Sequence, residues 1–159
     1  MRCEIQKIID KLEEVFTGSP WHGASIISQI TDIDESIVYV RACEQHSIIE
    51  IVYHMINWRL FDISRLEKNV PSLKFFEEND WIIIKKKDNH SWNDAIQTLY
   101  STQEKLIQLL KAINEELLDK IVTERNYTYK HLFTGIIHHD IYHSGQIAYI
   151  NKLFKRESK

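Results

Sequence analysis

The chain has 159 residues and a mass of 19.0 kDa, which is the size of one domain. Its 43% hydrophobic content excludes a disordered chain, and its formal net charge of −3 gives no basic surplus for binding nucleic acid. Only 4 glycines and 2 prolines are present, which argues against a β-sandwich and favours long helices.

The cysteine content and the hydropathy of the sequence indicate the cellular compartment in which the protein is expected. Two cysteines, Cys3 and Cys43, cannot form a disulfide framework or a four-thiolate zinc site, and both suit a reducing cytosol. The N-terminal segment lacks the apolar middle of a signal peptide, and no window approaches the roughly 18 apolar residues of a membrane span. We therefore expect a cytoplasmic protein with neither a membrane nor a nucleic acid as partner.

The first half of the chain contains three helical patterns. Residues 1–16 carry apolar side chains at steps of three and four, which predicts an amphipathic helix. A short helix is expected over residues 24–30. Ser47 and Glu50 then match a capping box, which predicts a helix running to about residue 68.

The second half predicts two more helices and two connections. Residues 70–90 form a long connection, of a length that more often covers a functional site than joins helices in a bundle. Ser91 is the expected cap of a helix that ends near residue 113. Residues 114–128 connect it, with one helical turn, to a last helix over residues 129–155.

Four long amphipathic helices in one chain of this size predict an all-α fold. Each apolar stripe must be covered by neighbouring helices, so we expect a four-helix bundle forming a single domain over residues 1–159. Gly135 and Gly145 interrupt the last helix, and we expect them to let a neighbouring element approach closely.

Four of the eight histidines lie in the last predicted helix, and helical phase separates them. At about 100° per residue, His139 and His143 fall on or beside the arc of apolar side chains. His138 projects about 100° away from that arc, on the side of His131 and Tyr142. We therefore expect His139 and His143 to face the core and His138 to face elsewhere.

Two histidines one turn apart on a core-facing stripe can reach one ion. His54, at the edge of the stripe on the helix over residues 47–68, is the best third ligand. Three imidazoles leave an open position for water or substrate and suit Zn²⁺, Ni²⁺, Cu²⁺ or Fe²⁺, whereas the lack of a carboxylate argues against Ca²⁺ and Mg²⁺. The alternative is that these are core histidines, hydrogen-bonded to Tyr53, Asp140 or Gln146.

The segments around these histidines resemble the DinB superfamily, which includes the YfiT-type bacillithiol transferases. The resemblance rests on the 47–58 segment ending in Trp58 and on the 135–147 segment with its histidines followed by Gln146. It implies a DinB/YfiT-like four-helix bundle, often dimeric, with a divalent metal on His54, His139 and His143. Zn²⁺ or Ni²⁺ are the first choices for that metal, and Fe, Mn or Cu are also compatible.

The resemblance also implies candidate activities. One is a metal-dependent transferase that joins a low-molecular-weight thiol to a small electrophile. The alternatives are a metal-dependent hydrolase and a non-catalytic metal-binding dimer with a structural or sensing role. Supporting roles around the metal or in the pocket are expected for Gln146, Asp140, Trp58 and Tyr53. A homodimer is expected from the resemblance.

Overall fold

The computed structural model describes residues 3–41, 44–67, 71–86 and 90–157, so Cys43 lies outside the described residues. Helices dominate the described part, which has no strand beyond an isolated bridge between Ile121 and Thr128. The elements are α1 (Glu4–Phe16), α2 (Ile26–Thr31), α3 (Ile48–Leu66), α4 (Leu73–Glu78), α5 (Trp92–Ala112), a 3₁₀ turn (Glu115–Asp119) and α6 (Tyr129–Glu157). The all-α fold predicted from the sequence is confirmed.

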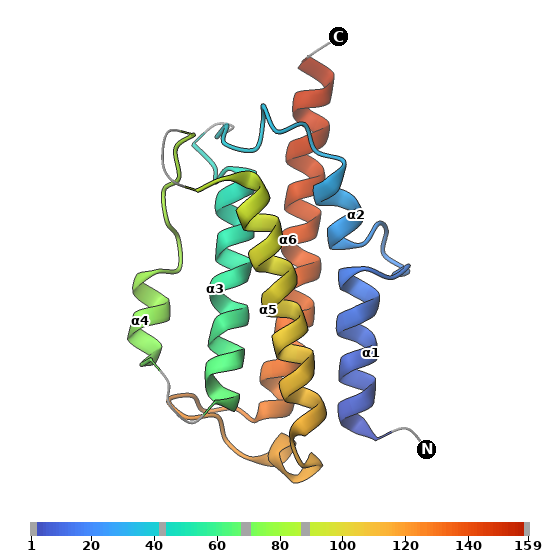
Figure 1. Ribbon diagram of the computed structural model, residues 1–159, viewed down its shortest axis with the longest axis vertical. Helices are drawn as coiled ribbons and strands as arrows, with labels where there is room; N and C mark the ends of the chain where they lie inside the picture. The colour runs from blue at the N-terminus through green and yellow to red at the C-terminus, as the bar shows by residue number, and fades with distance from the viewer. Residues whose placement is uncertain (1–2, 42–43, 68–70, 87–89, 158–159) are drawn as a thin grey trace.

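The four long helices α1, α3, α5 and α6 form the bundle. In Figure 1, α3 and α5 run in one direction and α1 and α6 in the other. Helix α3 packs against α5 and α6, and α1 packs against the same two helices. Helix α6 is longer than its partners, and α1 and α2 both contact it, one above the other in Figure 1. None of the described helices is long and apolar enough to cross a membrane.

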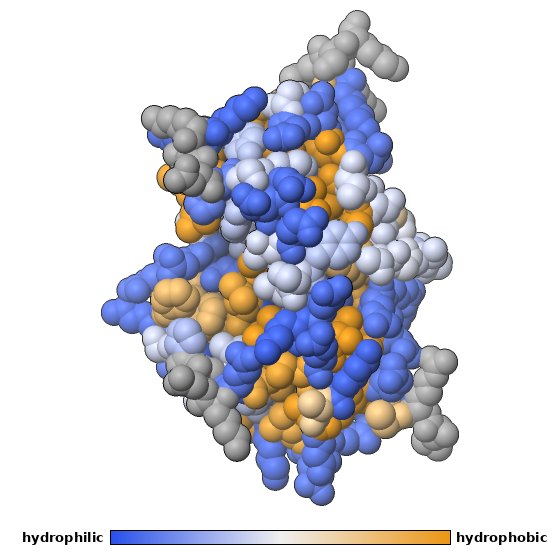
Figure 2. All heavy atoms as spheres, viewed as in Figure 1, coloured by the Kyte–Doolittle hydropathy of each residue, from blue (hydrophilic) through white to orange (hydrophobic). Residues whose placement is uncertain are grey.

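Apolar periodicity explains why these segments are helices. The stripe of α1 is buried as a whole, and it consists of Ile5, Ile8, Ile9, Leu12, Val15 and Phe16. In α5, the Ser91 hydroxyl caps the helix by accepting a hydrogen bond from the Asp94 backbone N–H at 3.0 Å. Hydrophilic residues are spread over the face shown in Figure 2, with apolar atoms visible between them, as expected of helices that bury one stripe each.

Glu50 in the first turn of α3 has a wider role than the predicted cap. Its carboxylate accepts hydrogen bonds from the backbone N–H of Ser47 at 3.0 Å, from Arg41 and from the backbone N–H of Ile84 at 3.0 Å. Burial by itself would raise the pKa of Glu50, but these three donors outweigh it and lower the pKa. The buried carboxylate therefore also fixes the end of the connection that leads away from α4.

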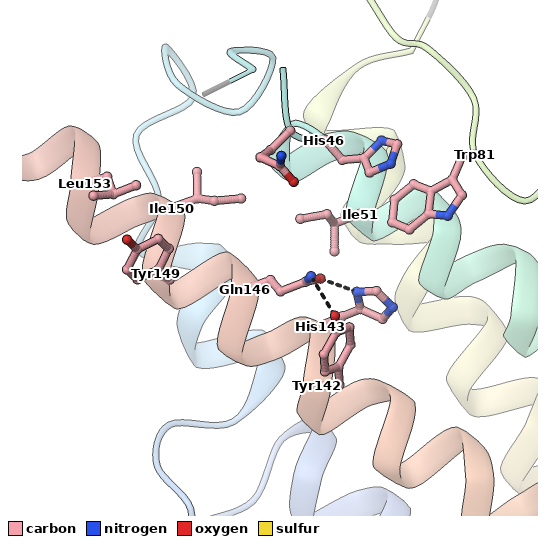
Figure 3. A pocket seen from close by; sticks show the side chains of 10 residues that line it. His46, Ile51, Trp81, Tyr142, His143, Gln146, Tyr149, Ile150 and Leu153 are labelled. Atoms are coloured by element: carbon pink, nitrogen blue, oxygen red, sulfur yellow. Dashed lines mark hydrogen bonds between the residues drawn. The ribbon is translucent and has the colours of Figure 1, made fainter. Parts of the chain in front are cut away.

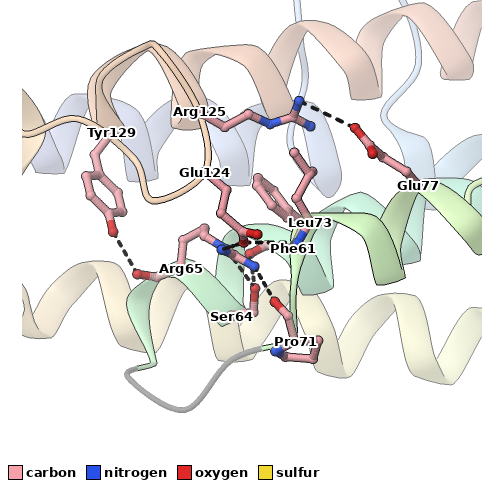
Figure 4. Close-up of polar contacts among 9 residues, drawn as sticks. All are labelled: Phe61, Ser64, Arg65, Pro71, Leu73, Glu77, Glu124, Arg125 and Tyr129. Carbon is pink, nitrogen blue, oxygen red and sulfur yellow. Dashed lines mark hydrogen bonds and ion pairs between the residues drawn. The ribbon is translucent and has the colours of Figure 1, made fainter.

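The predicted connection after α3 contains α4, a short helix that periodicity did not reveal. We call residues 71–84 of this connection, which include α4, the strap, because they run alongside α3 (Figure 1). Arg65 fixes the start of the strap: its guanidinium donates to the Pro71 carbonyl and pairs with Glu124 at 2.9 Å (Figure 4). The Glu124 carboxylate also accepts from the Leu73 backbone N–H at 3.0 Å, at the N-terminus of α4.

The two glycines of α6 are not sites of close packing. Within the described part of the chain, no heavy atom outside their own helical turns lies within 4 Å of the position that a Cβ would take at Gly135 or Gly145. The expectation that a neighbouring element approaches there was therefore wrong. At both positions, open space lies where a side chain would project, so the packing of α6 does not require a glycine there.

Candidate metal centre

The bundle brings His54 of α3 together with His139 and His143 of α6. One ligand atom from each ring lies within 4.8 Å of the others, and the Nε2 atoms of His54 and His139 are 2.9 Å apart. His54 and His143 are buried and His139 is half-buried. His138, the next residue on α6, is exposed, as the helical phase predicts. The structure thus brings together the three predicted ligands across two helices.

His54 is oriented by the strap. Its Nδ1 lies 2.9 Å from the Asp80 carboxylate oxygen and 3.1 Å from the Asp80 carbonyl oxygen. Both atoms are acceptors, so Nδ1 carries the proton and Nε2 keeps its lone pair. Trp81 stacks on the same ring, with centroids 3.8 Å apart and planes 7° from parallel. The hydrogen bonds to Asp80 and the stacking by Trp81 therefore hold the ring of His54 in one orientation.

His143 is oriented by its own helix. Its Nδ1 donates to the Gln146 side-chain oxygen at 2.6 Å, and Gln146 in turn donates to the Tyr142 hydroxyl at 3.3 Å (Figure 3). This bond leaves Nε2 of His143 unprotonated as well. A histidine that ligates a metal almost always donates its second N–H to such a partner, because this fixes the tautomer and the ring orientation.

The protonation state of the three histidines favours the binding of a metal cation. Burial, together with positive charge on His143, His54 and Arg59, lowers the pKa of His139 to about 3. Burial also lowers the pKa of His143 to about 4 and lowers the pKa of His54, which Asp80 partly offsets. All three imidazoles are thus neutral near pH 7, which is the form that binds metals. The residues present fit a divalent transition metal, since each of the three neutral imidazoles offers a ring nitrogen within 4.8 Å of the other two.

The other sequence-derived candidates have different surroundings. Trp58 donates from its indole N–H to the Asp80 carboxylate at 2.6 Å, so it holds the residue that orients His54. The Asp140 carboxylate pairs with the buried guanidinium of Arg59. Tyr53 packs edge-on against His90, with ring centroids 5.0 Å apart.

Sequence reasoning missed the contribution of the strap. Asp80 and Trp81 lie in a segment without helical periodicity, 26 and 27 residues after His54. The one available signal was the unusual length of the connection, which is typical of segments that cover a site. His46, which precedes α3, was missed too, and its ring stacks on the other face of Trp81 at 3.7 Å.

A cavity of about 410 Å³ opens beside the centre. Figure 3 shows side chains from α6, the start of α3 and the strap around it. The lining residues are Gln45, His46, Ile51, Trp81, Tyr142, His143, Gln146, Tyr149, Ile150 and Leu153. None of these described residues is an aspartate, glutamate, lysine or arginine, so the walls are apolar and aromatic with a few neutral polar groups.

Comparison with known families agrees with this architecture. A family model described as the DinB superfamily matches residues 27–147, a stretch that contains His54, His139 and His143. A search of curated proteins and a search of solved structures each found no match. The matched stretch covers most of the bundle and the whole candidate metal centre.

Proposed function

Since the chain belongs to the DinB superfamily, we propose that it is a metal-dependent transferase that joins a low-molecular-weight thiol to a small electrophile. The observation that carries this proposal is the apolar, aromatic cavity that reaches His143 of the triad. Metal sites that serve only the fold are closed by protein ligands, whereas catalytic sites keep a position open. A three-histidine centre beside an open cavity therefore favours chemistry over a purely structural ion.

The chain would hold the metal through His54, His139 and His143, with Zn²⁺ or Ni²⁺ as the first choices. When bound, such an ion supplies acidity, because a thiol that coordinates it loses its proton. Asp80 and Gln146 hold the Nδ1 atoms of His54 and His143, which leaves Nε2 of each ring unprotonated for the metal. Trp81 covers the face of His54 and excludes water from it.

The composition of the cavity supports a thiol over water as nucleophile. A metal-dependent hydrolase commonly uses a carboxylate as general base for water, as in the glutamate of the H-E-x-x-H motif. The described residues that line the cavity include no carboxylate. A coordinated thiol needs no such base. The same absence of charged side chains suits an uncharged electrophile, which would lose little solvation on entering.

The reaction is balanced without an external oxidant or reductant. The thiol sulfur forms a bond to an electrophilic carbon, and the S–H proton passes to solvent. With a haloarene the carbon–halogen bond breaks and halide leaves. With an epoxide the carbon–oxygen bond breaks and the oxygen takes up a proton.

Thiol consumption by the metal-loaded protein tests the proposal. Protein reconstituted with Zn²⁺ or Ni²⁺ should consume bacillithiol, mycothiol or another small thiol in the presence of an activated haloarene or an epoxide. A chelator and His139→Ala should both abolish turnover. His138→Ala is the matched control, since its side chain is exposed on the same helix, and it should keep the activity. Lack of turnover with every thiol in fully metal-loaded protein would refute the transferase proposal.

A further inference from the structure

A second cavity, of about 190 Å³, lies against His139. It is separate from the cavity that reaches His143, and its wall includes Trp58, Asp62, Tyr127 and Gly135. The proposed function makes no use of it. The polar atoms in its wall nevertheless concern the metal centre directly.

Two of the residues that line this cavity each carry a buried polar atom without a hydrogen-bond partner among the described residues. These atoms are Nδ1 of His139 and Oδ2 of Asp62, a side chain that is only 2% exposed. Leaving such a group unsatisfied is costly, so native structures rarely do so. Because Asp62 and His139 line the same small cavity, their unpartnered atoms suggest a shared partner that is not a protein group.

The three histidines differ in this respect. His54 donates its second N–H to Asp80, and His143 donates to Gln146. His139 has no such acceptor in the described part of the chain. Because a metal-ligating histidine almost always has one, the cavity that His139 lines is the place to look for the missing acceptor.

The cavity has room for a water molecule. A water occupies about 30 Å³ of liquid and is stable in a protein interior when it has two to four polar partners. Part of the room exists because residue 135 is glycine, since no described heavy atom outside its own helical turns lies within 4 Å of the position of its absent Cβ. Burial raises the pKa of Asp62 well above its ordinary value, and a carboxyl group in either form offers an acceptor oxygen.

We propose that, when Nε2 of His139 ligates the metal, this cavity holds a water molecule that accepts a hydrogen bond from Nδ1–H of His139 and donates one to Asp62. Asp62 is thereby a positioning residue, which acts on the metal centre through the water and the His139 ring. The inference rests on metal binding by the histidine triad and is independent of thiol transfer.

Substitution of Asp62 tests the link through metal affinity. Zn²⁺ affinity is measured by competition with a chromophoric chelator, for the parent chain, Asp62→Leu and Asp62→Asn. Asp62→Leu removes the acceptor and should weaken Zn²⁺ about tenfold or more, the usual effect of losing an outer partner. Asp62→Asn keeps an acceptor oxygen and should stay within about threefold of the parent chain. The melting temperature of each metal-free protein is recorded to show that it is folded.

A second pair of variants, one test and one control, examines the water while Asp62 stays in place. Gly135→Leu would fill the cavity and should also weaken Zn²⁺. Gly145→Leu is the matched control, because it makes the same change at an open position of α6 that does not line this cavity, and it should leave the affinity unchanged. In the zinc-loaded, ¹⁵N-labelled protein, the Nδ1–H signal of His139 should be protected from exchange and should lose that protection in Asp62→Leu and Gly135→Leu.

The outcomes separate this inference from the rest. If the parent chain binds about one Zn²⁺ and Asp62→Leu binds it equally tightly with an unchanged His139 signal, the inference is wrong and the metal centre stands. If the parent chain binds no metal after reconstitution, the triad itself fails as a metal site, and the inference and the proposed function fail with it. Metal binding without thiol consumption would remove the proposed function alone.

Discussion

Replacing Asp80 by alanine should weaken Zn²⁺ binding about tenfold, because the strap would lose the carboxylate that orients His54. That carboxylate lies 2.9 Å from Nδ1 of His54 and accepts the Trp58 indole N–H at 2.6 Å. The substitution removes both contacts and creates no clash. The ring of His54 then keeps its place with less support, so the effect is on affinity more than on stoichiometry.

The magnitude follows from what remains in the variant. Loss of an outer partner of a metal-ligating histidine typically costs about 10–100-fold in affinity, which corresponds to about 1.4–2.8 kcal/mol. The backbone carbonyl of Asp80 still lies 3.1 Å from Nδ1 of His54, and stacking by Trp81 remains. We therefore expect the lower end of this range.

The assay compares four proteins by chelator competition. Besides the parent chain and Asp80→Ala, Asp80→Asn keeps an acceptor oxygen and should recover most of the affinity. Asp32→Ala is the control, since the Asp32 side chain is 81% exposed and forms an ion pair with Lys155 of α6. Equal affinity in Asp80→Ala and the parent chain, or an equal loss in Asp32→Ala, would refute the role given to the strap.

Three further predictions concern the histidines and a buried acid. His139→Ala should lose the metal and exposed His138→Ala should retain it, as measured by elemental mass spectrometry; equal losses would contradict the assigned helix phase. In the metal-free protein the pKa of His139 is lowered to about 3 and that of His143 to about 4, so their contribution to stability is complete above the ordinary value of 6.5. That contribution should be lost as the pH falls from 6.5 through these values, which urea unfolding at a series of pH values would detect. Burial raises the pKa of Asp62, so its contribution to stability is present below the ordinary value of 3.8 and is lost as the pH rises. Asp62→Asn should accordingly raise the melting temperature of the metal-free protein at pH 7 and should lose this advantage near pH 4.

The bundle and the convergence of its histidines were predictable because both depend on local periodicity. The phase of α6 fixes the relative directions of His138, His139 and His143 once the helix exists. The stripe of α3 places His54 toward the core for the same reason. A pattern that repeats every three or four residues survives without knowledge of the rest of the fold.

The parts that could not be predicted depend on contacts between distant segments. Asp80 meets His54 only because the strap is held against α3, and no local pattern encodes that approach. Asp140 was a candidate partner for the histidines because it precedes His143 by less than one turn. Its carboxylate pairs with Arg59, a contact 81 residues away in sequence. The phase argument also gave no information on Gly135, whose surroundings are set by neighbouring helices.

Polar contacts hold the strap at its start, along its length and at its end. At its start, the Leu73 backbone N–H donates to Glu124, and at its end the Ile84 backbone N–H donates to Glu50. Between them, the Asp80 carboxylate lies beside His54. Both end contacts are hydrogen bonds to carboxylates, which are about twice as strong as bonds between neutral groups.

This arrangement has a consequence for local unfolding. Proteins open in cooperative units whose free energies lie below that of global unfolding. With carboxylate contacts at Leu73 and Ile84, we expect the strap to detach as one such unit and not to fray residue by residue. Native-state hydrogen exchange would then show the amides of these two residues opening with a shared free energy, and the exposure of His54 to solvent would follow the same event.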